Sequence, residues 1–112
     1  ATVEDLAKFA IAVQTGVLIT KATLEQMFIR QKTRGGQDVP FGLGWVIEVR
    51  NGQKEVWHLG GGQGVSNILY MQPDHGLAVV LLMNVNGLAT PLTAAPILDL
   101  ARRIAAIASP SP

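Results

Sequence analysis

The chain has 112 residues, of which 48% are hydrophobic and 15% charged, with a net charge of +1 and no cysteine. This length predicts one segment, residues 1–112, and the balanced charges exclude an electrostatic case for nucleic acid, while the lack of cysteine excludes disulfides and thiolate metal sites. The charged fraction is well below the usual value of about 25%, which predicts that a partner covers part of the surface.

Two helices are predicted within residues 1–38. The first has apolar residues at helical spacing, namely Leu6, Phe9, Ala10 and Val13. Thr2 can cap the N-terminus of this helix, and Gly16 can end it. The second helix begins near Thr20 or Thr23 and has the apolar face Leu24, Met27 and Phe28. The polar stretch 30–38, which contains two glycines, is predicted to be a loop.

Antiparallel strands are predicted over residues 41–84. From Phe41 the apolar residues alternate, which places on one strand face Leu43, Trp45, Ile47 and Val49. Asn51-Gly52 predicts a two-residue hairpin turn. That turn sets Trp45 opposite His58 and Ile47 opposite Val56. It also opposes two like charges, Glu48 and Glu55, which is mildly unfavourable.

Two further strands complete the predicted sheet. Val65–Met71 is followed by a turn at Pro73–Gly76 and by a last strand at Leu77–Asn84. The last strand is apolar on both faces, which predicts a central position in a sheet that is covered on both sides. Its apolar run from Leu77 to Met83 is far shorter than the roughly 20 residues of a membrane-spanning helix, so no membrane span is expected.

A C-terminal helix is predicted within residues 94–108, from about Pro96 to Ala108, and residues 109–112 are predicted to be a tail. Its predicted apolar face consists of Ile97, Leu100, Ala101, Ile104 and either Ile107 or Ala108. Asp99 and Arg103 are spaced as an i,i+4 ion pair. Two helices, three to four antiparallel strands and a final helix predict an α+β fold.

The candidate functional residues lie in the run His58–Gly64, between two predicted strands. A histidine beside bare backbone N–H groups suits proton transfer or anion stabilisation. The same spacing also fits a half-buried strand histidine followed by a glycine bulge or tight turn. The run lacks the Lys-Ser/Thr of a phosphate loop and leads into a strand, which argues against nucleotides. His58, Asp74 and His75 lack the spacing of metal ligands, and no metal or cofactor is expected.

An ordered set of segments carries a family resemblance: Phe41–Trp45, Trp57–Asn67 and Leu77–Asn84, preceded by the opening helix. Together they resemble the C-terminal part of the serine beta-lactamase-like family. That family includes class C beta-lactamases, penicillin-binding DD-peptidases, esterases and D-aminopeptidases. The resemblance implies a partial beta-lactamase/transpeptidase-like fold in a bacterial serine hydrolase. Such an enzyme forms an acyl-enzyme from an ester, peptide or beta-lactam, and needs no cofactor.

The resemblance also implies roles for single residues. In this family an active-site strand carries Lys-Thr-Gly or His-x-Gly, and His58-Leu59-Gly60 is similar to the histidine form. His58 would then assist proton transfer, and Gly61 would donate its N–H to the oxyanion hole. The implied substrate-binding positions are Leu59, Gly60, Gly62 and Gln63. Leu59 replaces a threonine whose hydroxyl would bind a carboxylate, which favours ester or peptide substrates over beta-lactams.

Two family motifs are missing from residues 1–112. The sequence contains no Ser-x-x-Lys, and Tyr70-Met71-Gln72 does not match Tyr-x-Asn. The resemblance therefore implies a C-terminal segment that is silent alone and whose partner is the N-terminal remainder of a parent enzyme. It also implies that the strand Leu77–Asn84 has an open edge and that Ile97 and Ile104 are partly bare, so we expect a homodimer. The alternative function is a non-enzymatic interaction domain that binds a partner or a second copy through this edge.

Overall fold

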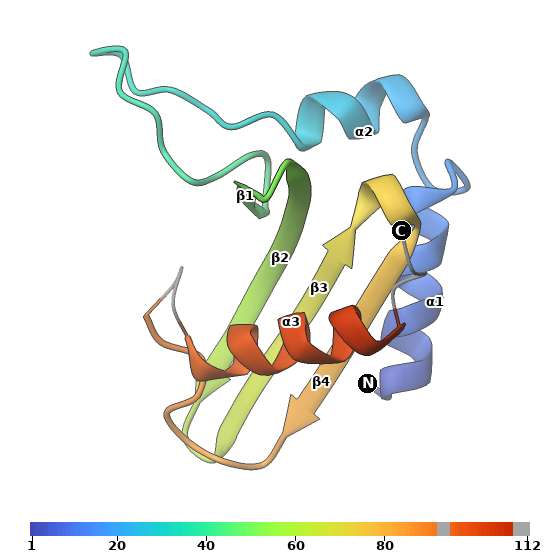
Figure 1. Ribbon diagram of the computed structural model, residues 1–112, viewed down its shortest axis with the longest axis vertical. Helices are drawn as coiled ribbons and strands as arrows, with labels where there is room; N and C mark the ends of the chain where they lie inside the picture. Colours follow the sequence, from blue (N-terminus) through green and yellow to red (C-terminus); the bar gives the residue numbers. More distant parts are fainter. Residues whose placement is uncertain (92–94, 109–112) are drawn as a thin grey trace.

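The computed structural model describes residues 1–91 and 95–108. Its elements are α1 (Val3–Gln14), α2 (Lys21–Met27), β1 (Val46–Arg50), β2 (Gln53–Gly62), β3 (Val65–Gln72), the 3-10 turn η1 (Pro73–His75), β4 (Leu77–Met83) and α3 (Pro96–Ala108). The strands form an antiparallel sheet of four in the order β1-β2-β3-β4 (Figure 1). The predicted α+β fold is confirmed. Residue 94 and the predicted tail 109–112 lie outside the described residues.

The first two helices begin where their caps predict. The Thr2 hydroxyl accepts a hydrogen bond from the Asp5 N–H at 3.1 Å, and Thr20 caps α2 in the same way. Gly16 follows α1 with a φ of +81°, a conformation that favours glycine and ends the helix. One residue of the predicted apolar face departs from expectation. Phe9 is 44% exposed, since α1 buries mainly Ala10 and Val13 against the sheet.

The first strand is shorter than the alternating pattern predicts, because β1 begins at Val46 and not at Phe41. A local turn interrupts the extended chain: the Gly42 N–H donates to the Trp45 carbonyl at 2.8 Å, and Gly44 has a φ of +83°. Leu43 is exposed as a result, whereas Trp45 is buried on the face of Ile47. Apolar residues continue to alternate along the sequence through this turn, so the pattern alone does not indicate the turn.

The hairpin register is confirmed. Asn51 and Gly52 both have positive φ, as a two-residue hairpin turn requires, and Ile47 lies opposite Val56. Glu48 lies opposite Glu55 despite their like charges. Arg102 of α3 contacts both carboxylates, so the pairing is stabilised by a group that is remote in sequence.

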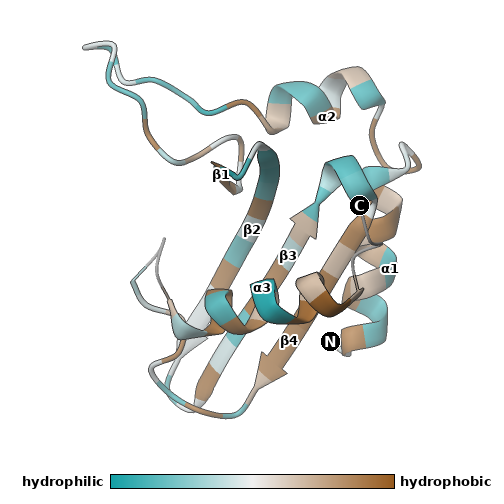
Figure 2. Ribbon diagram, viewed as in Figure 1, coloured by the Kyte–Doolittle hydropathy of each residue, from teal (hydrophilic) through white to brown (hydrophobic). Residues whose placement is uncertain are grey.

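The position of β4 corrects a prediction. This strand lies at the edge of the described sheet and not at its centre. It is apolar on both faces because α1 packs near one face and α3 packs on the other (Figures 1 and 2). Cover by two helices therefore explains the apolar sequence, and a second neighbouring strand is not needed to explain it.

The C-terminal helix is rotated relative to its predicted apolar face. Its buried residues are Ile97, Leu98, Ala101 and Ala105, and the predicted Leu100 and Ile107 are exposed. Ile97, expected to be partly bare, is only 1% exposed. The rotation turns Arg102 toward the sheet. The predicted Asp99–Arg103 pair forms, with 3.0 Å between Nε and Oδ2.

The sheet separates two hydrophobic clusters, and residues alternate between them along each strand. We call the side covered by α3 the α3 face; its cluster includes Trp57, Tyr70, Leu98 and Ala101. We call the other side the α1 face; α1 and α2 cover part of it, and its cluster includes Ala10, Phe28, Trp45 and Val56. The candidate residues of β2 follow this alternation.

Candidate functional site

The candidate residues lie on the second half of β2, where the strand loses its neighbour on one side. β1 begins only at Val46, opposite Trp57, whereas β3 pairs with β2 as far as Gly62. Among the described residues, no strand flanks positions 58–62 on the β1 side. The register with β3 is continuous through the glycines, so the bulge that the spacing allowed is absent. We call this stretch the open edge of β2.

The hydrogen bonds of β1 fix the direction of the backbone groups at the open edge. The Ile47 N–H donates to the Pro40 carbonyl at 2.7 Å, away from β2. In an antiparallel pair the backbone groups of successive residues point to alternate sides, so Val46 and Trp57 point toward each other. Continuing the alternation along β2, the N–H groups of Leu59 and Gly61 point out of the open edge. Those of His58, Gly60 and Gly62 point toward β3.

The side chain of His58 lies on the α1 face and is exposed. Its ring makes an edge contact with Trp45, with 6.5 Å between centroids and planes at 88°. A cavity of about 300 Å³ lies beside it, lined by His58, Gly60 and apolar side chains that include Phe9, Trp45 and Leu82. The imidazole is therefore accessible from the α1 face.

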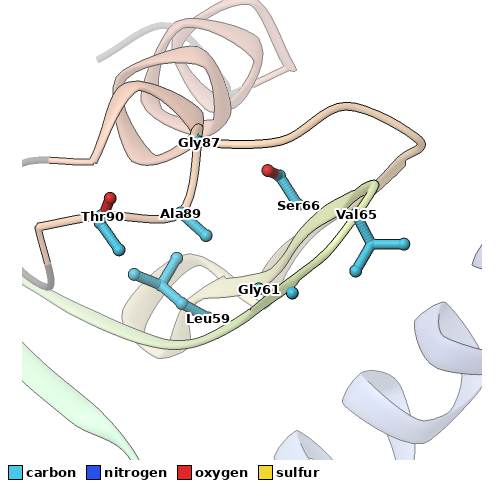
Figure 3. Close-up of a pocket in the computed structure, with 8 residues that line it drawn as sticks. Leu59, Gly61, Val65, Ser66, Gly87, Ala89 and Thr90 are labelled. Atoms are coloured by element: carbon cyan, nitrogen blue, oxygen red, sulfur yellow. The ribbon is translucent and has the colours of Figure 1, made fainter.

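Leu59 and Gly61 occupy the opposite face. A Cβ on Gly61 would lie 3.3 Å from the Cβ of Ala89, in the segment that follows β4. A cavity of about 420 Å³ opens here, with walls from Leu59, Gly61 and Gly62 on one side and Ala89 and Thr90 on the other (Figure 3). We call it the Gly61 cavity. The sequence did not single out the segment that forms its second wall, since that segment carries no ionisable residue or motif.

Ser66 also lines the Gly61 cavity, and its hydrogen bonds argue against a role as nucleophile. Its hydroxyl donates to the Val85 carbonyl at 2.6 Å and accepts from the Leu88 N–H at 3.1 Å. The side chain is 0% exposed. A nucleophilic serine needs a base within hydrogen-bond reach, and the partners of this hydroxyl are backbone groups. Ser66 therefore anchors the segment after β4.

Gln63 takes no part in either cavity. It lies with Gly64 in the turn that joins β2 to β3, and Gly64 has a φ of +78°. The structure therefore does not bring Gln63 together with the other predicted substrate-binding positions. His58 and Gly60 lie on one face, and Leu59 and Gly61 on the other, so the residues meet only at the strand edge itself.

A buried polar network on the α3 face lies beneath the first half of β2. Arg102 Nη2 lies 2.8 Å from Glu55 Oε1 and 3.2 Å from Glu48 Oε2, and its guanidinium stands over the Trp57 ring at 5.6 Å. The Tyr70 hydroxyl donates to Glu55 and accepts from the Gln72 amide. Sequence reasoning noticed the opposed glutamates and missed this cation.

The network sets two pKa values. Burial alone would raise the pKa of Glu55, but the hydrogen bonds and charge of Arg102, with the hydrogen bond from Tyr70, outweigh it and hold that pKa below its usual range. Burial, together with the neighbouring Glu55 carboxylate, raises the pKa of Tyr70 to about 12. Tyr70 is 0% exposed and fully engaged, so it is a structural group and not a catalytic one.

Neither a metal cluster nor a membrane helix is found in residues 1–91 and 95–108. No group of three or more His, Asp or Glu side chains there could hold a metal ion. His75 lies in η1, away from His58 on β2. The helices α1, α2 and α3 are all too short or too polar to cross a membrane.

Comparison with known families supplies one match. The family model described as Beta-lactamase matches residues 1–103. No curated protein matches the chain significantly. The match spans all three helices, in part or whole, and all of the sheet, including the open edge of β2.

Proposed function

This chain belongs to the beta-lactamase family, and we propose that it supplies one wall of a serine hydrolase active site. The open edge of β2 binds the scissile carbonyl group of an ester, peptide or beta-lactam. The serine nucleophile comes from a preceding part of a longer bacterial enzyme, of which residues 1–112 are a C-terminal portion. One observation carries the proposal: the Gly61 N–H points out of the open edge, three positions beyond an accessible His58.

The chemistry follows from these two groups. When a serine oxygen attacks the carbonyl carbon, negative charge builds on the carbonyl oxygen, and the Gly61 N–H stabilises it. One such donor contributes about 3 kcal/mol to the transition state. His58 exchanges a proton with the serine or the leaving group, and water then hydrolyses the acyl-enzyme. Gly60 has no side chain and leaves room for the substrate between these two groups.

The α1 face has the apolar surface expected where a further part of a parent enzyme packs. Exposed apolar side chains lie on this face, with Phe9 at 44% and Leu82 at 37% exposure. The apolar cavity beside His58 opens between them. A further part of a parent enzyme, packed on this face, would bury these groups and bring a nucleophile close to His58.

Ester and peptide substrates fit the edge better than carboxylate-bearing beta-lactams. Leu59 points to the α3 face, where it packs partly buried against the hydrophobic cluster. It provides no hydroxyl to bind a carboxylate at this position. The parent enzyme is therefore closer in substrate preference to esterase- or peptidase-like members of the family.

The proposal is tested by extending the chain. Residues 1–112 alone are expected to show no hydrolysis of nitrocefin or p-nitrophenyl esters and no labelling by a fluorophosphonate. The same chain, preceded by the residues encoded upstream of it, is expected to hydrolyse a short p-nitrophenyl ester and to be labelled on a Ser-x-x-Lys serine. Burst kinetics and labelling of the 112-residue chain itself would overturn the proposal.

A second candidate function, self-association, is favoured by the edge of β4. By the same alternation, the backbone groups of Ala78, Val80 and Leu82 point away from β3, and no described strand pairs with them. An apolar edge with free donors and acceptors adds strands from other chains. The occupant here is a second copy, joined by strand addition or helix exchange around a two-fold axis.

Light scattering on a size-exclusion column tests this association. A dimer is expected at about 100 μM, where a weak dimer with Kd of about 1 μM is fully formed. Val80→Lys should shift the equilibrium toward monomer, whereas Gln31→Lys, in the exposed loop before β1 at the other end of the sheet, should not. A folded monomer of the unmodified chain at this concentration would contradict the association.

A further inference from the structure

The Gly61 cavity is notable for the absence of charge in its walls. Its lining consists of Leu59, Val65, Ala89, Thr90, Ser66 and glycine backbone (Figure 3). No residue from 59 to 73 or from 76 to 98 is Asp, Glu, Lys, Arg or His. Both sequence segments that form the walls are therefore neutral along their whole length.

The second wall is held in place by three connections. The buried Ser66 hydroxyl bonds Val85 and Leu88, and the Asn86 side chain accepts a hydrogen bond from the Gly64 N–H. The Ile97 N–H donates to the Leu88 carbonyl at 2.9 Å and ties the segment to the start of α3. Leu88, directly before the wall residues Ala89 and Thr90, is therefore bonded through both its N–H and its carbonyl. A site that is already formed loses little free energy to ordering when a ligand binds.

The polar groups that remain for a ligand are uncharged. The Ser66 hydroxyl is already used, which leaves the Thr90 hydroxyl and the backbone at the open edge of β2, where the Gly61 N–H points outward. A carboxylate placed here would lose water without gaining a cation, which is costly. An apolar or amide group would bury its surface against Leu59, Val65 and Ala89 at no such cost.

We propose that the Gly61 cavity is a subsite for a small uncharged group, an alkyl, aryl or primary amide group, and that it discriminates against a carboxylate. The inference relies on the proposed function only for its relation to the reaction: the cavity adjoins Gly61, so it would receive the part of a neutral ester or amide that lies next to the scissile carbonyl. Binding of the group itself requires neither a nucleophile nor turnover.

The test compares two ligands of the same shape and different charge, benzamide and benzoate, by titration of the ¹⁵N-labelled 112-residue chain. Benzamide is expected to shift the amide signals of Gly61, Gly62, Ala89 and Thr90 with a Kd of about 1 mM, the affinity of a ligand with few atoms. Benzoate is expected to bind at least about tenfold more weakly than benzamide. Equal or tighter binding of benzoate, or no shift of these signals by benzamide, would overturn the inference.

A charge placed in the wall sharpens the test. Thr90→Lys is expected to reverse the preference, because the ammonium group supplies the cation that benzoate lacks. Gln31→Lys adds the same charge in the exposed loop before β1 and should leave the preference unchanged. Where the spectrum of Thr90→Lys shows an unfolded chain, Val65→Lys at the 40% exposed rim serves instead. A preference unchanged by a folded wall variant would count against the cavity as the binding site.

The outcomes separate this inference from the proposed function. If the extended protein does not hydrolyse esters, the proposed function is wrong, but the preference of the cavity for benzamide is unaffected. Ester hydrolysis by the extended protein, combined with equal binding of benzamide and benzoate, would remove only the neutral subsite.

Discussion

The two faces of the sheet treat their polar groups in opposite ways. On the α3 face, Glu55 is 2% exposed and is bonded by Arg102 and Tyr70, so its buried charge is fully compensated. On the α1 face, His58 is exposed beside an apolar cavity, and large apolar side chains remain bare around it. Along the first half of β2 the α3 face encloses a compensated charge, whereas the α1 face leaves a reactive group exposed. The neutral Gly61 cavity lies farther along β2 on the α3 face.

The largest effect is expected from removing Arg102 from the α3 face. Arg102→Met leaves the buried Glu55 with only the partly exposed Arg50, whose Nε lies 3.4 Å from Glu55 Oε1, and directly opposite Glu48. The fold should lose about 3 kcal/mol of stability, because most of the hydrogen bonds to a buried charge are lost. Urea unfolding followed by circular dichroism measures the change.

Arg103 provides the matched control for that variant. Its pair with Asp99 is exposed on both sides, at 76% and 67%. Arg103→Met is expected to change the free energy of unfolding by about 0.5 kcal/mol or less. Similar losses of stability for Arg102→Met and Arg103→Met would contradict the expectation that the buried ion pair contributes more to folding than the exposed one.

The next effect concerns the direction of the backbone at the open edge. Gly61→Pro removes an N–H that bonds no strand, and its Cβ would lie 3.3 Å from that of Ala89, which must move by a few tenths of an ångström. The fold should therefore persist with a small loss of stability. Turnover of the extended protein should fall by about 10²–10³-fold because the oxyanion loses a donor. Kinetics with a p-nitrophenyl ester, alongside urea unfolding, measure both quantities.

Gly60→Pro is the control, because its N–H points toward β3. This variant is expected to lose a ladder hydrogen bond and to unfold more easily than Gly61→Pro. If Gly60→Pro is the more stable of the two, the assigned direction of the β2 backbone is wrong.

Two groups of the α3 face, Glu55 and Tyr70, should contribute to the pH dependence of stability. The pKa of Glu55 is lowered by folding, so its contribution is present above its unfolded pKa and is lost as pH falls through the folded value. The pKa of Tyr70 is raised from 10.0 to about 12, so its contribution is present below pH 10 and is lost as pH rises toward 12. The alkaline loss is at most about 2.7 kcal/mol, the equivalent of two pKa units.

Urea unfolding from pH 3 to 12 measures this profile. Glu55→Gln should flatten the acid limb, and Tyr70→Phe should flatten the alkaline one. An acid limb unchanged by Glu55→Gln would assign it to other carboxylates.

The smallest effect on folding is expected at His58. His58→Ala removes an exposed side chain whose described contact is the edge of Trp45, so the free energy of unfolding should change by about 0.5 kcal/mol or less. Turnover of the extended protein should nevertheless fall by about 10²-fold, the usual contribution of a positioned acid or base. Loss of folded protein in proportion to activity would identify His58 as structural.

Local signals predicted the elements well where the cause was local. Thr2 and Gly16 delimit α1, and Asn51-Gly52 fixes the register of β1 and β2, because caps and two-residue turns depend on neighbouring backbone groups. The predictions were wrong where the structure depends on contacts between residues that are far apart in the sequence. The start of β1 depends on the Gly42–Trp45 turn, and the rotation of α3 depends on the reach of Arg102 to a glutamate 47 residues away.

The candidate site divides in the same way. Sequence indicated His58 and Gly61 through their resemblance to a family pattern, and the family match agrees with that resemblance. The sequence could not show that His58 and Gly61 lie on opposite faces, because the face of each residue depends on the strand register. Nor could it show that Ala89 forms the second wall, because the path of the chain after β4 depends on packing.

The sequence by itself determined the α+β order of elements, the hairpin turns and the strand that carries the glycines, since each is encoded by residues a few positions apart. The tertiary structure alone decided which backbone groups of β2 lack a neighbouring strand, because that depends on where β1 begins. It alone decided that two opposed glutamates are tolerated, since their shared cation comes from α3. Charge and hydrogen bonds act over a few ångströms in space, and only the folded chain brings such distant residues that close.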